Sequence, residues 1–101
     1  MQIDIKTENG TSVAMLKGEI DHHCARDIRT QLDKFIIGSR PSKLVIDLKN
    51  ITFMDSSGIG LIMGRSKLMK ACGGQLVVHS PQPYIKRVLK RSGIERIVSI
   101  T

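Results

Sequence analysis

A carboxylate and two hydroxyls stand side by side at Asp55-Ser56-Ser57-Gly58, between a strand-like run and a helical stretch. Such oxygens commonly accept hydrogen bonds from the free N–H groups of a first helical turn. Two hydroxyls and a carboxylate are more than a cap requires. A hydroxyl there also lies at the positive end of a helix dipole, which tolerates a phosphate. The segment is therefore compatible with a helix cap and with a phosphorylation site.

The helix that follows, to about residue 71, is apolar nearly all round. One side, suited to packing on a sheet, carries Leu61, Gly64, Leu68, Ala71 and Cys72. The largely opposite side carries Ile59, Ile62, Met63 and Met69. An apolar outer face in so small a chain favours contact with another protein, and methionine suits an adaptable surface. Burial beneath a neighbouring helix is the alternative.

Catalytic chemistry is disfavoured. A serine nucleophile at Ser56 or Ser57 would need a histidine base, and no spacing in the sequence brings a histidine close. The segment differs from the Gly-x-Ser-x-Gly elbow. His22-His23-Cys24 has poor spacing for a metal, and the glycines before Arg65-Ser66 lack the lysine of a phosphate loop. We expect no enzyme activity, catalytic residue, metal or other cofactor.

The chain alternates strands and helices after an opening hairpin, whose turn is predicted at Asn9-Gly10. A helix capped by Asp21 and a later helix opened by Ser80-Pro81 are also predicted. The remaining expected elements are strands at 3–6, 13–16, 44–48, 76–78 and 97–100 and the helix that follows residue 55. Strand–helix–strand alternation implies parallel crossovers. The fold class is therefore α/β: a mixed β-sheet with an opening hairpin and helices packed on it.

Composition indicates one domain over residues 1–101, with 41% apolar residues and only 3% aromatic ones. The core must then consist of Ile, Leu, Val and Met. No apolar run approaches the ~20 residues that span a bilayer, and the N-terminus does not resemble a signal peptide. We expect a cytoplasmic protein, without membrane attachment, that is a monomer. Cys24 and Cys72 are expected to be reduced core or near-core residues.

The net charge of +7 arises entirely after residue 55, where Glu95 is the only acidic residue. Such a basic half could bind nucleic acid, an anionic membrane or an acidic protein. Its cations cluster late in the chain, at Lys86, Arg87, Lys90, Arg91 and Arg96. The aromatic residues that a single-strand binder interleaves with its cations are missing apart from Tyr84. Solvated helix faces are favoured, and we expect no direct nucleic-acid binding.

The chain resembles the STAS domain of anti-sigma factor antagonists over essentially its whole length, the sporulation type above all. The general stress-response type is a close sister. The matching segments, in order, are Gly18-Glu19-Ile20-Asp21-His22-His23, Leu44–Leu48, Phe53-Met54-Asp55-Ser56-Ser57-Gly58-Ile59-Gly60, Met63-Gly64-Arg65 and Gly73-Gly74. Family members usually carry a further helix after the last strand, whereas this chain stops at Thr101, and they are less basic in the second half.

The resemblance implies a partner-switching regulator. Its unphosphorylated form binds an anti-sigma factor that is also a serine kinase, and so releases the sigma factor. The kinase phosphorylates Ser56, binding is lost, and a serine phosphatase restores the active form. The resemblance further implies that Ser57 caps the helix and that Asp55 orients the acceptor or the loop. The implied partner-binding residues are Glu19, Asp21, Asp55, Ser57, Ile59 and Met63.

Overall fold

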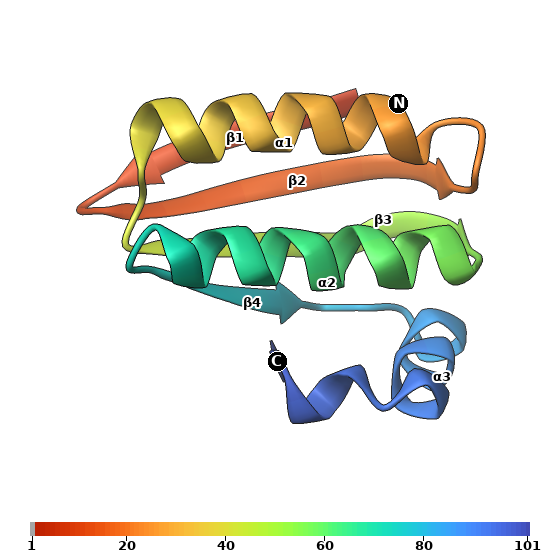
Figure 1. The fold of residues 1–101 in the computed structure, drawn as a ribbon. Coiled ribbons are helices and arrows are strands. Elements are labelled where there is room, and N and C mark those ends of the chain that lie inside the picture. The colour runs from red at the N-terminus through yellow and green to blue at the C-terminus, as the bar shows by residue number, and fades with distance from the viewer. Residues whose placement is uncertain (1) are drawn as a thin grey trace.

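The computed structural model describes residues 2–101, which form a five-stranded sheet in the order β1-β2-β3-β4-β5 (Figure 1). The strands are β1 (Gln2–Glu8), β2 (Thr11–Ile20), β3 (Lys43–Met54), β4 (Gln75–His79) and β5 (Ser99–Ile100). β1 pairs with β2 antiparallel, and every later pairing is parallel. The mixed α/β sheet expected from the sequence is thereby confirmed. The opening hairpin turns at Asn9 and Gly10, whose φ angles of 51° and 80° suit the left-handed turn that Asn-Gly predicts.

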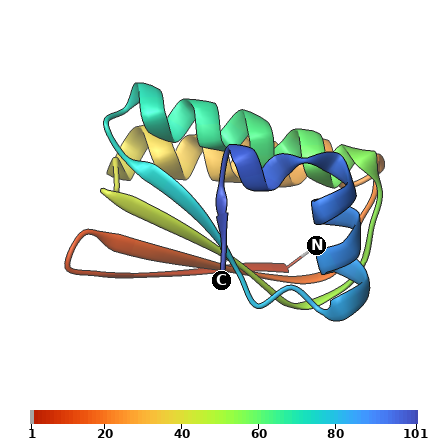
Figure 2. The same ribbon diagram turned by 90° about the horizontal axis from the view of Figure 1, so that it is seen from below.

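Helices α1 (Ala25–Ser39) and α2 (Ser56–Ala71) lie side by side over one face of the sheet (Figures 1 and 2). The predicted stripe on α1 is buried at Ile28, Leu32 and Ile36. These residues join a core made of Ile, Leu, Val, Met and Ala. Of the helices within residues 2–101, none is long and apolar enough to cross a membrane.

The third helix, α3 (Pro83–Ser92), lies apart from this pair, at the end of the sheet toward which β4 points (Figure 1). It leads through a short 3-10 turn, η1 (Ile94–Arg96), to β5. The prediction that Ser80-Pro81 opens this helix is wrong. Ser80 has a left-handed φ of 55°, and the N-cap is Gln82, which the following Pro83 keeps extended.

Two further expectations are corrected. Asp21 is not the N-cap of α1: the helix begins four residues later, after Cys24, and Asp21 holds the turn that precedes it. On α2 the buried residues include Ile62 and Met69, which the sequence pattern assigned to the outer face. Ala71, assigned to the packed face, is exposed. The side of α2 that faces the sheet is therefore not the predicted one: Gly58, one turn before Ile62, lies against Met54 of β3, and Met69 lies against Gly74, just before β4.

Candidate functional site

The segment around Asp55 lies beside the segment around Asp21 because the two follow neighbouring parallel strands. Ile20 at the end of β2 pairs with Met54 at the end of β3. One residue further on, the backbone N–H of Asp55 donates to the carbonyl of Ile20 at 3.2 Å. Loops that leave parallel strands at the same edge meet there, which is where α/β folds commonly place their sites.

Asp55 is the N-cap of α2. Its backbone is extended, with φ −107° and ψ −170°, and its Oδ1 accepts a hydrogen bond from the backbone N–H of Ser57 at 2.8 Å. Its carbonyl accepts from the N–H of Gly58 at 3.0 Å. The expectation that Ser57 caps this helix is therefore wrong, because the aspartate ahead of both serines already occupies that position. Ser56 becomes the first helical residue and is exposed, whereas Ser57 is half-buried.

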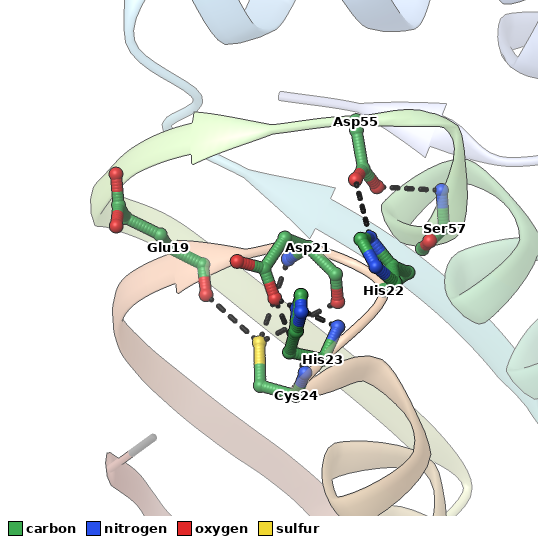
Figure 3. Close-up of polar contacts among 7 residues, drawn as sticks. All are labelled: Glu19, Asp21, His22, His23, Cys24, Asp55 and Ser57. Atoms are coloured by element: carbon green, nitrogen blue, oxygen red, sulfur yellow. Dashed lines mark hydrogen bonds and ion pairs between the residues drawn. The ribbon is translucent and has the colours of Figure 1, made fainter.

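Asp21 organises the other loop (Figure 3). Its Oδ1 accepts hydrogen bonds from the backbone N–H of His23 at 2.9 Å and of Cys24 at 3.2 Å. Desolvation acts to raise the pKa of Asp21, but hydrogen bonds from Cys24 and His23 outweigh it and lower the pKa below its ordinary value. The thiol of Cys24 donates to the carbonyl of Glu19 at 3.0 Å and so ties the end of β2 to the start of α1.

An imidazole lies between the two loops. Nδ1 of His22 is 4.0 Å from Oδ2 of Asp55, and the His22 side chain is 75% exposed (Figure 3). So exposed a pair contributes little to stability. It does mark how close the two loops lie, since His22 follows Asp21 directly and its ring points toward the carboxylate of Asp55 (Figure 3).

The apolar part of this end of the molecule is smaller than the sequence pattern suggests. Ile59 and Met63 are half-buried and pack against the core while keeping part of their surface in water. Phe53 is a residue that the sequence interpretation did not assign to the site. Its side chain is 37% exposed and it pairs with Glu19 across β2 and β3. The exposure of Phe53 could have been predicted from the alternation of side chains along a strand. Because Met54 points into the core, Phe53 before it points to the opposite face of β3.

The site therefore presents an exposed serine at the N-terminus of α2, next to the carboxylate of Asp55 and beside the turn that Asp21 holds, with partly exposed apolar side chains further along the helix. Asp21 and Asp55 supply its carboxylates, whereas the carboxylate of Glu19, at the end of β2, points away from them (Figure 3). Among residues 2–101 no three side chains of metal-binding type converge. The arrangement is suited to binding a protein surface and to accepting a covalent charge.

Comparisons with known proteins agree on one family. A family model described as the STAS domain matches residues 2–101. A protein of Paenibacillus polymyxa named anti-sigma F factor antagonist is 39% identical over 100 residues, which are 99% of this chain and 86% of the relative. The solved anti-sigma factor antagonist SpoIIAA in its unphosphorylated form is 28% identical with a TM-score of 0.84, over 99% of this chain and 88% of that one. The Bacillus cell fate determinant SpoIIAA in its phosphorylated form is 28% identical with a TM-score of 0.75, over 99% and 91%.

Proposed function

Because this chain belongs to the STAS domain family, we propose that it is an anti-sigma factor antagonist that is inactivated by phosphorylation of Ser56. The observation that carries the proposal is the position of the two serines. Ser56 is exposed at the first residue of α2, while the backbone of Ser57 is held by Asp55 and its side chain is half-buried. A kinase can reach the first hydroxyl more readily than the second.

A phosphate on Ser56 would leave the fold intact and change the surface. The helix N-terminus offers free N–H groups and a positive dipole end, which stabilise an anion. The added charge of about −1.5 to −2 would lie next to the carboxylate of Asp55 and beside the loop that carries Asp21. A partner that covers this end would then have to bury the phosphate together with a neighbouring carboxylate, and its affinity would fall. The existence of SpoIIAA structures in unphosphorylated and phosphorylated forms supports the same switch here.

The contact surface of this proposal surrounds Ser56. Polar contacts come from Glu19 at the end of β2, Asp21 in the turn after it, Asp55 at the cap of α2 and Ser57 in its first turn. Apolar contacts come from Ile59 and Met63, whose partial exposure leaves surface for a partner.

The partner in this proposal is an anti-sigma factor that is also the serine kinase, and a serine phosphatase reverses the modification. The name of the Paenibacillus polymyxa relative supports anti-sigma F factor, and with it sporulation. The chain acts in the cytoplasm as a regulatory binding protein, not as an enzyme.

The test is phosphorylation in vitro. The wild-type protein, Ser56→Ala and Ser57→Ala are each incubated with purified anti-sigma F factor and ATP, and phosphate is located by mass spectrometry. We expect modification of the wild type at Ser56, none of Ser56→Ala, and modification of Ser57→Ala. Phosphate on Ser57 in the wild type, or no phosphate at all, contradicts the assignment.

Binding measurements on Ser56 variants distinguish an effect on the partner contact from an effect on folding. Ser56→Ala should bind anti-sigma F factor in the presence of ATP without being released, whereas Ser56→Asp should bind it weakly. Both variants should keep the circular dichroism spectrum of the wild type, because an exposed first-turn residue makes little contribution to the core.

A further inference from the structure

A groove runs between α1 and α2, continuous with the switch site. A hollow of about 480 Å³ lies between the two helices, with Ser57 toward the end where α2 begins. Arg26 and Arg29 of α1 and Arg65 of α2 line its walls. The groove thus begins at the proposed contact surface and leads away from it between the two helices.

Two glycines keep this groove open. Gly60 and Gly64 lie one turn apart on α2 and line the hollow. A Cβ at either position would meet nothing within 4 Å, so neither glycine is required by packing in the isolated chain. Gly58 differs, because a Cβ there would collide with the side chain of Met54. Glycine weakens a helix relative to alanine, and here the two missing side chains leave α2 open to a group that approaches from outside.

Arg65 lines the same groove and is incompletely partnered. Its side chain is 9% exposed, and Nε lies 2.8 Å from Oδ1 of Asp33 in an ion pair that lacks hydrogen-bond geometry. Nη1 is buried and has no hydrogen-bond partner among the described residues. Burial lowers the pKa of Arg65, Asp33 acts to raise it, and the charge of Arg29 lowers it further. Buried donors of this kind are normally satisfied, so Arg65 leaves an unused donor beneath the surface of the groove.

The groove has a surplus of positive charge along its length. Beyond Arg29 and Arg65 it continues into a second hollow of about 750 Å³, which reaches Lys34 and the 56% exposed Ile37. Asp33 is the only acidic residue that lines either hollow. A small anion would contact one part of this groove. An extended polypeptide segment can contact the arginines along the groove and Ile37 at its far end at the same time.

We propose that this groove binds an acidic segment of the anti-sigma factor, with carboxylate side chains facing Arg26, Arg29 and Arg65. The inference rests on the proposed function, since it assigns a second contact to the same partner. Charge complementarity favours it, because guanidinium groups bind carboxylates through paired hydrogen bonds. Continuity favours it too, because Ser57 belongs both to the switch site and to the groove.

The test is calorimetric titration of purified anti-sigma F factor with the unphosphorylated protein. The groove variant is the double substitution Arg26→Glu and Arg29→Glu. The matched control is Arg87→Glu and Arg91→Glu, which makes the same charge change at exposed positions on α3. We expect the groove variant to bind at least about tenfold more weakly and the control to stay within about twofold of wild type. The affinity of the wild type should also fall more steeply with added salt than that of the groove variant.

A second variant tests the shape of the groove without changing its charge. Gly64→Leu places a side chain in the open space, so it should weaken binding by about tenfold while thermal unfolding shows a folded protein. Unchanged affinity in both groove variants overturns the inference. If the groove variants bind like wild type but Ser56→Asp binds anti-sigma F factor weakly in the same titration, the groove inference is wrong and the proposed function still holds. If wild type does not bind anti-sigma F factor at all, both fail.

A small-anion site is the remaining outcome. Inorganic phosphate is added during an NMR titration, and the amide signals of Arg29 and Arg65 are followed. Saturable shifts at these residues, combined with partner affinity that is insensitive to both groove variants, would assign the groove to a free anion and would overturn the inference.

Discussion

Oδ1 of Asp55 accepts a hydrogen bond from the backbone N–H of Ser57 at 2.8 Å and thereby caps α2. Ser56, whose hydroxyl is proposed for phosphorylation, lies between these two residues. Asp55 satisfies one of the free N–H groups of the first turn without using Ser56. The proposed acceptor is therefore positioned by the cap but is not itself needed for it. This separation allows Ser56 to be modified while the start of the helix stays in place.

Removal of this cap should destabilise the protein. Asp55→Ala leaves the N–H of Ser57 without its acceptor, at an expected cost of about 1 kcal/mol in the free energy of unfolding. In a chain of this size that corresponds to a fall of about 4–8 °C in Tm, which thermal denaturation followed by circular dichroism measures. Asp55→Asn is the matched control, because its amide oxygen can still accept, and its Tm should stay close to that of wild type.

The close packing at the start of α2 gives a second prediction. Gly58→Ala should lower stability, because the new Cβ collides with Met54, a core residue that is 2% exposed. Overpacking of this kind costs about 1–3 kcal/mol, against a gain in helix propensity of about 1 kcal/mol at most. Gly60→Ala, on the same helix and with open space around it, should leave Tm unchanged or raise it. Equal Tm changes in the two variants would contradict the packing argument.

The order of elements was predictable because short-range signals carry it. Asn9-Gly10 predicts its turn from backbone preference alone, and the stripe of Ile28, Leu32 and Ile36 predicts which side of α1 is buried. On α2 the same reasoning failed. An all-round apolar helix has no single periodic stripe, so only its packing against the sheet and α1 decides that Ile62 is buried while Met63 keeps some exposure.

The site was predictable as a segment but not as a geometry. The order Asp-Ser-Ser allows either Asp55 or Ser57 to cap the helix, and the choice depends on where the first turn closes. Proximity of His22 to Asp55 depends on β2 and β3 being parallel neighbours with Ile20 beside Met54. The groove between α1 and α2 arises from the packing of two helices that are distant in sequence, so no local pattern indicates it.

The outer apolar contacts give a third prediction. Met63→Lys should weaken binding to anti-sigma F factor by about tenfold or more, because a charge would enter an apolar contact. It should change Tm little, since a lysine can lay its methylene stem over the half-buried surface and keep its ammonium in water. Met69→Ala is the comparison for a core position, and full burial there predicts a loss of about 2–5 kcal/mol. A large Tm loss in Met63→Lys would make Met63 a core residue and remove it from the contact surface.

The lowered pKa of Asp21 gives a pH-dependent prediction. A carboxylate whose pKa is lower in the folded protein than in the unfolded chain stabilises the fold above its ordinary value of 3.8. That stabilisation is lost as the pH falls through the lowered folded pKa, because the protonated group holds the N–H donors of His23 and Cys24 less well. Asp21→Asn keeps an acceptor oxygen but not the charge, so it should be less stable than wild type at neutral pH.

The difference in Tm between wild type and Asp21→Asn should therefore stay constant from neutral pH down toward the ordinary pKa and shrink below it, as wild type loses the charged form. Thermal unfolding at a series of pH values measures it. Asp27→Asn serves as the control. Asp27 is an exposed carboxylate in the first turn of α1, and it accepts a hydrogen bond from the side chain of Gln31 instead of holding the backbone of the turn. A difference for Asp21→Asn that persists unchanged in acid would mean that its charge does not hold the turn.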